Sequence, residues 1–284
     1  MMRMLWQRLR ADPMAFCCLT LLVLILFAGI FAPWLAPQDP TLTAIRHKYQ
    51  PMSLNHLLGT DNLGRDVLSR LLYGIRTTVF LSLFAMLVTI LFGTVVGFIA
   101  GYFRGRIDEW LMRLCDMMLS FPSEVMIFAI VGMLGPGINN IILAIVVIKW
   151  AWYARMIRGV VVQYSDKNYI RYAKVIACSD RHIMLKHLLP VTAAEIIVLA
   201  TTDMGSVILT ISALSFLGLG VQPPTPEWGV MLNEAKNVMF SHPTLMLPAG
   251  IAVVMVVAAF NFIGDFLRDA LVPSSQSDSS SAGN

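Results

Sequence analysis

Apolar residues fall into six long blocks along the chain, separated by segments rich in Gly, Pro and charged side chains. Each block is close to the length of about 20 residues that a helix needs to cross the hydrocarbon core of a bilayer. Turn-forming residues between such blocks are typical of connections between helices. The pattern therefore predicts six membrane-spanning helices, at residues 13–35, 78–102, 111–134, 141–157, 190–216 and 245–266.

Two of these spans contain residues that modify a plain helix. Pro122 lies inside the third span, and its missing N–H predicts a kink near Phe121. Gly93, Gly97 and Gly101 recur every four residues in the second span, so they share one face of the helix. A face of small residues lets a neighbouring helix approach closely, and we expect helix packing there.

The remaining segments divide the chain further. Residues 1–12 are short and basic, residues 38–76 form a loop, and the Ser-rich stretch 273–284 predicts disorder. Residues 78–270 form a five-helix core that includes a polar segment at 158–190. A basic start followed by an apolar run also describes a signal peptide, but no small-x-small cleavage pattern follows the run, so we expect an uncleaved anchor.

The composition supports an all-α polytopic membrane protein. Hydrophobic residues make up 57% of the chain and charged residues 13%, whereas soluble domains are about a quarter charged. Of the 21 Lys and Arg, 14 lie in the termini and in loops that six spans place on one side, against 6 on the other side. Cytoplasmic loops are enriched in these cations, which predicts that both termini are cytoplasmic. The net charge of +4 therefore indicates orientation in the membrane and not a nucleic-acid partner.

A long polar interruption at residues 165–190 combines cations with an apolar rhythm that includes Ile170, Ala173 and Ile176. Such a pattern is typical of a helical segment in water with an apolar stripe that its own loop does not bury. We expect a soluble partner to dock on this segment.

No catalytic motif is found in the sequence. It has no H-E-x-x-H, no G-x-S-x-G and no Gly-Lys dipeptide, so it lacks a P-loop, and the four cysteines show no metal spacing. We therefore predict that the chain is not an enzyme and that it has no metal site. If nucleotide drives its function, ATP is bound by another polypeptide.

Charged residues within the predicted spans are costly in lipid and tend to mark function. Asp203 lies deepest and is expected to face the bundle interior or a water-filled cavity, in a transport path or in a structural hydrogen-bonding role. Lys149 is close enough to its predicted helix end to extend its amine to the interface. Glu124 is expected to satisfy backbone groups freed at Pro122, and Glu195 to reach water at its helix end.

The five histidines do not form a metal pair in the sequence. The i, i+5 spacing of His182 and His187 is expected to place them on different helical faces. His47, His56 and His242 lie in the two long loops opposite the termini, where they could meet an incoming cation.

Three stretches, at residues 58–78, 215–231 and 259–269, resemble the signature of the second permease subunit of peptide- and nickel-type ABC importers. The resemblance covers nearly the whole chain. It implies the type I importer permease fold, a bacterial inner-membrane location, and one half of a translocation path. It also implies a second homologous permease subunit, two ABC ATPases that hold ATP and Mg, and an extracytoplasmic solute-binding protein. The loop motif that carries the resemblance comprises Gly59, Thr60, Asp61, Gly64, Arg65 and Asp66.

In that family a cytoplasmic motif, E-A-A-x-x-x-G followed by L-P, forms short coupling helices that fit a groove of the ATPase. The corresponding run here begins at Arg171, and the Glu, the first Ala and the Gly are replaced. Ser179 or Asp180 is expected to cap a second short helix. The residues that the resemblance assigns to ATPase coupling are Arg171, Ala173, Ala177, Ser179, Asp180, Arg181 and Pro190.

The stretch at residues 149–159, KWAWYARMIRG, resembles nickel permeases more than dipeptide permeases. This resemblance favours nickel or a metal–chelate complex as the solute, ahead of a di- or oligopeptide. Asp203, Trp150 and Trp152 are the candidate residues of the path. The main alternative is a secondary transporter driven by an ion gradient, which would require inverted repeats and more intramembrane charge.

Overall fold

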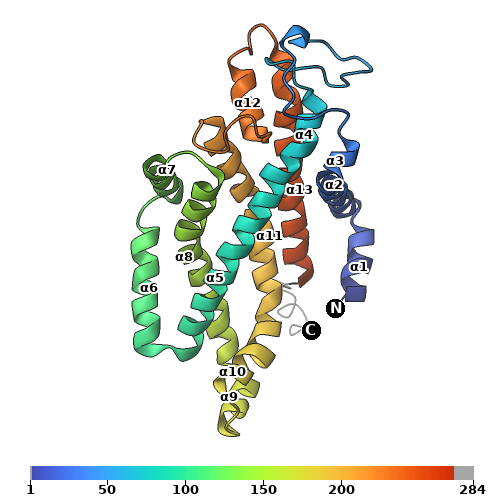
Figure 1. Ribbon diagram of the computed structural model, residues 1–284. Helices are drawn as coiled ribbons and strands as arrows, with labels where there is room; N and C mark the ends of the chain where they lie inside the picture. The colour runs from blue at the N-terminus through green and yellow to red at the C-terminus, as the bar shows by residue number, and fades with distance from the viewer. Residues whose placement is uncertain (1, 272–284) are drawn as a thin grey trace, which may run out of the picture.

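Long helices run side by side along the molecule in the computed structural model, which describes residues 2–271 and the side chains of residues 5–271 (Figure 1). The tail predicted at residues 273–284 lies outside the described residues. In chain order the elements are α1 Met2–Ala11, α2 Pro13–Ile30, α3 Ala32–Leu35, η1 Ile45–His47, α4 Val67–Ile75, η2 Arg76–Phe80, α5 Leu81–Phe103, α6 Gly105–Leu119, α7 Ser123–Leu134, α8 Ile138–Ser165, α9 Asn168–Val175, α10 Asp180–His182, η3 Ile183–Leu188, α11 Leu189–Phe216, α12 Trp228–Lys236, η4 Pro243–Met246 and α13 Leu247–Leu271.

Within the described residues, five continuous helical stretches are long and apolar enough to cross a membrane. A sixth span is obtained if α6 and α7 are taken together, although they meet at an angle of 79°. The kink predicted near Phe121 is therefore a full break. Pro122 has an extended backbone, with ψ at 124°, and precedes the first residue of α7, so the helix stops and restarts there. The five stretches are Pro13–Ile30, Val67–Phe103, Ile138–Ser165, Asp180–Phe216 and Pro243–Leu271.

Two helices extend into regions that the sequence predicts as loops. Helix begins at Val67 and continues through the π-helical turn η2 into α5, whereas the sequence pattern predicts a loop over residues 38–76 and a span that begins at residue 78. Asp66 caps this helix by accepting a hydrogen bond from the Ser69 amide at 2.8 Å. The Gly- and Pro-rich loop before the last span contains α12, which is capped by the buried Glu227.

The glycine face of α5 packs against α8, as its four-residue repeat predicts. A Cβ atom at Gly97 would lie 2.7 Å from the carbonyl oxygen of Ala154, and one at Gly93 would lie 2.7 Å from the Cβ of Tyr153. Only a residue without a side chain fits between these two backbones. α5 and α8 therefore form one tightly joined pair, while α11 packs mainly against α13.

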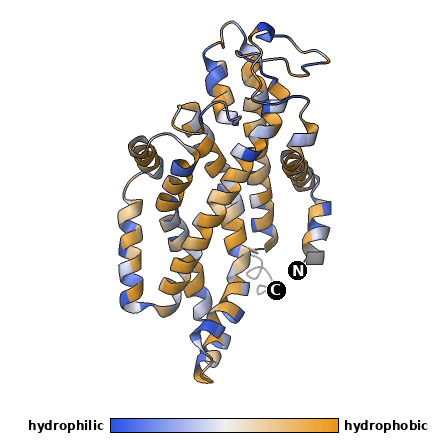
Figure 2. Ribbon diagram, viewed as in Figure 1, coloured by the Kyte–Doolittle hydropathy of each residue, from blue (hydrophilic) through white to orange (hydrophobic). Residues whose placement is uncertain are grey.

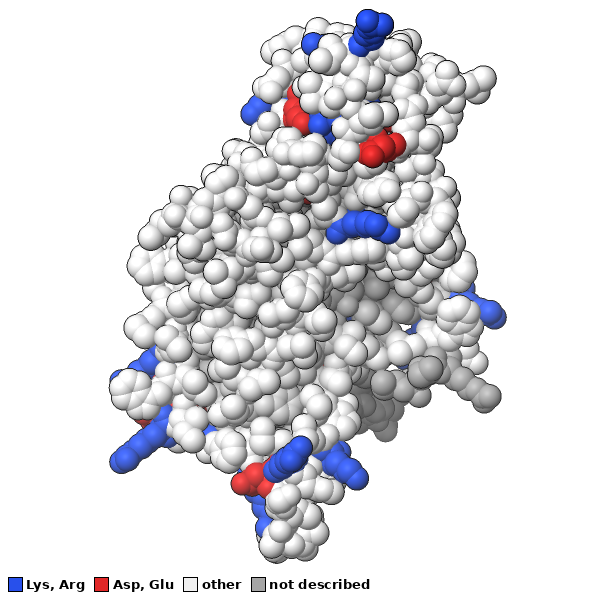
Figure 3. Space-filling view, viewed as in Figure 1, with Lys and Arg blue, Asp and Glu red and all other residues white. Residues whose placement is uncertain are grey.

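Charged side chains gather toward the two ends of the molecule, and the visible face between them is largely apolar (Figures 2 and 3). α12 and the loop before α4 form one end, and α9 and α10 project from the other (Figure 1). These are called the α12 end and the α9–α10 end below.

Candidate functional site

A cavity of about 410 Å³ lies between the α6–α7 break, α8 and α11. Its wall combines apolar side chains, including Phe121 and Trp152, with polar side chains from three helices. α7 contributes Ser123 and Glu124, α8 contributes Lys149 and Tyr153, and α11 contributes Asp203 and Ser206.

The sequence-based expectation that Lys149 extends its amine to the membrane interface is wrong. The helix that carries it runs from Ile138 to Ser165, so Lys149 lies near its middle, and the residue is only 8% exposed. Its amine donates hydrogen bonds to Asp203 Oδ2 at 3.2 Å and to Ser206 Oγ at 2.9 Å. The Tyr153 hydroxyl donates to the same oxygen of Asp203. This arrangement joins α8 to α11 through an enclosed ion pair.

The other path candidates are placed differently from one another. Asp203 borders the cavity, in agreement with the sequence-based expectation. Trp152 also borders it and is 38% exposed. Trp150 is buried in a separate cluster, with its ring 5.2 Å from that of Phe92 on α5, so it does not line this cavity. Glu124 accepts a hydrogen bond from the Ser123 hydroxyl at 3.0 Å and bonds no backbone group in the described structure, contrary to expectation.

The α9–α10 segment, residues 166–190, consists of α9, a turn, α10 and the π-helical stretch η3, which leads into the first residues of α11. α9 ends in a tight turn in which the Cys178 amide donates to the Ala173 carbonyl at 3.0 Å. Ala177 adopts a left-handed backbone in this turn, with φ at +57°. This conformation favours glycine, and the family motif has glycine here. Ala177 therefore adopts a backbone conformation that suits the glycine of the family motif. Ser179 caps α10, as predicted, by accepting from the His182 amide at 3.4 Å.

The apolar side chains of this segment are split between two environments. Ile170 and Ala173 are buried within the chain, so the stripe is not wholly unpartnered as the sequence pattern suggests. Tyr172, Val175 and Ile176 are 71%, 81% and 72% exposed at the tip. Arg171 and Arg181 are also exposed and form no ion pair within residues 5–271. The segment therefore presents an apolar and cationic surface beyond the bundle.

Two contacts tie this segment to the neighbouring end of α5. The Tyr102 hydroxyl donates to Asp180 Oδ1 at 2.6 Å, and the Lys174 amine lies 4.5 Å from the centre of the Tyr102 ring. Arg104 pairs with Asp166 at 2.9 Å and holds the pKa of that carboxyl below its ordinary value. A displacement of the segment would therefore also move the end of α5.

The expectation that His182 and His187 lie on different faces is wrong. The chain between them forms the π-helical turn η3, whose wider winding places residues i and i+5 above one another. Their ring centres are 5.4 Å apart. Across the described residues, no group of three or more His, Cys, Asp or Glu could hold a metal ion.

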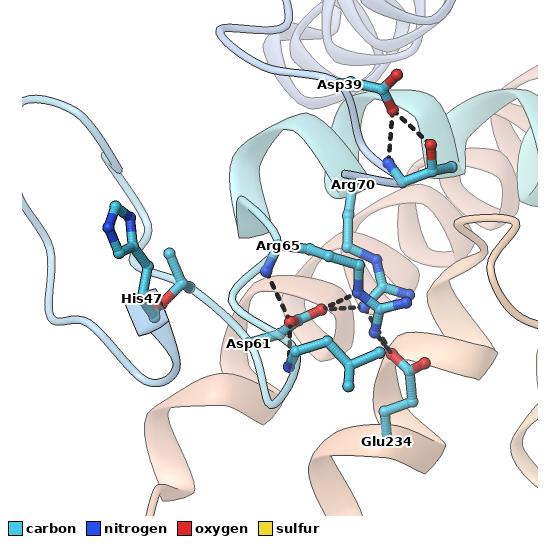
Figure 4. Close-up of polar contacts among 9 residues, drawn as sticks. Asp39, His47, Asp61, Arg65, Arg70 and Glu234 are labelled. Carbon is cyan, nitrogen blue, oxygen red and sulfur yellow. Dashed lines mark hydrogen bonds and ion pairs between the residues drawn. The ribbon is translucent and has the colours of Figure 1, made fainter. Parts of the chain in front are cut away.

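At the opposite end, the loop motif builds a buried charge cluster that fastens the first long loop to α12 (Figure 4). Arg65 and Arg70 are each 1% exposed. Asp61 Oδ2 accepts from both guanidinium groups, at 2.7 Å and 2.5 Å. Glu234 Oε2, from α12, also accepts from both, at 2.8 Å and 2.6 Å. Each arginine is thus held between two carboxylates.

The other residues of the motif shape the same loop. Gly59 and Gly64 have positive φ angles of 76° and 75°, and a Cβ at Gly64 would lie 1.9 Å from the Ala44 carbonyl oxygen. The Thr60 hydroxyl donates to the His47 carbonyl, and Asp66 bonds the buried His56 ring at 3.0 Å. His242 stacks on Tyr49 with ring centres 4.0 Å apart. These contacts stabilise the loop. The rings of His47 and His56 lie 6.4 Å apart, centre to centre, and within the described residues the three histidines form no group that could hold a metal ion.

Residues 93–276 match the family described as the binding-protein-dependent transport system inner membrane component, and residues 1–51 match the N-terminal transmembrane domain of oligopeptide transport permease C. The chain belongs to this family of inner-membrane permease components. It is a multi-pass membrane subunit of an ABC importer and not an enzyme, since ATP is hydrolysed on separate subunits. Family membership thereby decides against the secondary transporter.

Two curated relatives are similar over most of their length. The metal-staphylopine import system permease protein CntC of Staphylococcus aureus is 45% identical over 267 residues, which cover 94% of this chain and 92% of the relative. The glutathione transport system permease protein GsiD of Escherichia coli O157:H7 is 39% identical over 269 residues, which cover 94% of this chain and 89% of the relative. Both agree with the resemblance to the second permease subunit of peptide- and nickel-type importers.

Proposed function

We propose that this chain forms one half of a heterodimeric path that imports a metal–chelate complex. A second, homologous permease forms the other half, and two ATPases that bind ATP and Mg dock on the α9–α10 ends of the two permeases. A solute-binding protein delivers the cargo at the α12 end. The observation that carries the proposal is the exposed tip of Tyr172, Val175 and Ile176, which extends beyond the bundle and is tied to α5 behind it.

The charge distribution supports a cytoplasmic α9–α10 end. The loop with this segment is the richest in Lys and Arg, and such loops remain in the cytoplasm. α1 and the end of α13 lie toward the same end of the molecule, with Arg8 Nη1 3.3 Å from the Ala270 carbonyl oxygen (Figure 1). Both described ends of the chain would then be cytoplasmic, and the loop motif would face the binding protein.

A continuous set of contacts leads from the tip to the cavity. Closure of the ATPases on ATP would displace the α9–α10 segment, and the Tyr102–Asp180 bond would pass this displacement to α5. α5 cannot slide freely on α8 because the glycine face leaves no gap between the backbones. α8 carries Lys149, so rigid movement of the α5–α8 pair would reshape the cavity and alternate its access.

Two considerations favour a metal–chelate complex over a di- or oligopeptide. The more similar of the two relatives described above is named for metal-staphylopine import, and the other for glutathione. The wall of the cavity also carries both charge signs, from Lys149 and from Asp203 and Glu124. A chelate with carboxylate groups and a bound cation offers complementary charges to this wall.

The docking surface is tested by placing charge on it. We expect Ile176→Asp to reduce co-purification of the ATPase subunits, because the substitution puts a carboxylate into an interface centre that Ile176, 72% exposed here, would fill. Leu54→Asp, at a residue 97% exposed at the α12 end, is the matched control and should leave co-purification unchanged. Equal ATPase recovery with both variants would contradict docking at this tip.

The identity of the solute is tested by measuring uptake into right-side-out vesicles that carry the full complex together with its binding protein. Radioactive nickel mixed with staphylopine should enter only when ATP is supplied to the cytoplasmic side. Uptake of labelled glutathione in preference to this complex would show that the peptide alternative is correct.

A further inference from the structure

Resting on the proposed function, we infer that Lys149 and Asp203 are a binding site for a solute that carries both a carboxylate and a protonated amine. The solute carboxylate would replace Asp203 beside the Lys149 ammonium, and the solute amine would replace Lys149 beside the Asp203 carboxylate. One internal ion pair would thus be exchanged for two ion pairs with the cargo.

The location of the pair favours a role in recognition. Lys149 and Asp203 lie inside helices that are apolar enough to span a membrane, and their side chains are 10% and 23% exposed. The neighbouring Arg155–Asp116 pair between α6 and α8 is far more open, with both side chains more than half exposed. A buried pair is weak as a stabilising device, since apolar residues of similar volume commonly replace it without loss of stability. Charged groups at such depth are typical of solute and ion pathways.

Both partners retain hydrogen-bonding capacity toward the cavity. An ammonium has three donors, and Lys149 uses two of them, on Asp203 and Ser206. All the bonds that Asp203 accepts from described side chains fall on Oδ2, which leaves Oδ1 available. Both residues border the same cavity, so these free positions are within reach of a bound molecule.

The rest of the cavity fits a small, charged cargo. Its volume of about 410 Å³ lies within the range of small-molecule sites, which is roughly 300–1,000 Å³. Trp152 and Phe121 supply apolar surface, and Glu124 places a second carboxylate on the α7 side. A cation bound by the cargo would therefore find the Glu124 carboxylate in the same cavity.

The competing interpretation is that the pair only fastens α8 to α11, and two double variants separate the two roles. Lys149→Met with Asp203→Leu replaces the pair by an apolar contact. Lys149→Asp with Asp203→Lys keeps an internal ion pair but exchanges the positions of its charges. If the pair is only structural, both double variants should transport like wild type. If it binds the solute, both should lower uptake by roughly 10- to 100-fold, the value of one hydrogen bond to a charged group.

Uptake of radioactive nickel mixed with staphylopine, and of labelled glutathione, is measured in vesicles with the complete complex. Co-purification of the ATPases reports folding of each variant. The matched control is Glu195→Gln, which alters another α8–α11 contact, with the Tyr164 hydroxyl at 3.0 Å, outside this cavity; it should retain wild-type uptake. Wild-type uptake by either folded double variant would overturn the inference and leave the proposed function intact. Failure of the wild-type complex to take up either probe would instead refute the proposed function.

Discussion

The charge cluster at the α12 end provides a sharp test of what holds the first long loop in place. Glu234→Gln removes one negative charge with little change in volume. In the wild type Glu234 Oε2 accepts from Arg65 and Arg70, both fully enclosed. In the variant, Asp61 alone would have to balance the charges of two buried guanidinium groups. The Nε and Nη2 atoms of Arg70 already have no hydrogen-bond partner in the wild type.

The expected cost follows from this geometry. Breaking a buried ion pair by removing one partner costs about 3–5 kcal/mol. The Glu234 side chain is 16% exposed and the amide of Gln still accepts one hydrogen bond, so we expect the lower value of about 3 kcal/mol. For a chain of this size that corresponds to a decrease in Tm of roughly 6–12 °C.

The assay is thermal unfolding of the purified complex in detergent, compared with that of Glu109→Gln. Glu109 is exposed on α6 and forms no ion pair in the part of the chain that the structure describes, so its variant should stay within about 0.5 kcal/mol of wild type. A Tm for Glu234→Gln equal to that of the control would refute the reasoning, because the cluster would then contribute nothing to stability.

Three further predictions concern single residues. Ala177→Gly should stabilise the complex by about 0.5–1 kcal/mol in thermal unfolding, because relief of the left-handed strain exceeds the added chain entropy; a lower Tm would contradict this. Gly97→Leu should lower Tm and ATPase co-purification together, since its side chain would collide with the Ala154 carbonyl, and an unchanged Tm would show that α5 and α8 are not locked. Burial raises the pKa of Glu227, so the folded chain keeps the carboxyl proton at pH values at which the unfolded chain releases it. The stability of the folded chain should therefore fall as the pH rises above the ordinary pKa of glutamate. Glu227→Gln should weaken that pH dependence of Tm, and an identical pH profile would argue against it.

The order of the membrane-spanning helices along the chain could be predicted from the sequence, because apolar blocks of bilayer length leave few alternatives to a spanning helix. The close approach of α8 to Gly93, Gly97 and Gly101 could also be predicted, because small residues repeated at helical spacing commonly serve helix packing. The break at Pro122 was visible, but its 79° angle depends on how α6 and α7 pack, and no local pattern contains that information.

The polar contacts between distant segments could not be predicted. The predicted span, residues 141–157, is shorter than α8, and this difference makes Lys149 seem close enough to a helix end to extend its amine to the interface. Its partner Asp203 lies 54 residues away in the sequence. Glu234 and Tyr102 were missed for the same reason, since a single acidic or aromatic residue carries no sign of the arginine or aspartate that it meets. The face shared by His182 and His187 was missed because a π-helical turn cannot be read from residue spacing.

We propose that this chain imports solute only when ATPases act on its α9–α10 segment. The most direct test is uptake of radioactive nickel with staphylopine into proteoliposomes that contain the wild-type complex, with binding protein outside and ATP inside. Accumulation should require ATP, persist when ionophores dissipate ion gradients, and be lost with Ile176→Asp. Uptake that proceeds without ATP, or that is unaffected by Ile176→Asp, would contradict it.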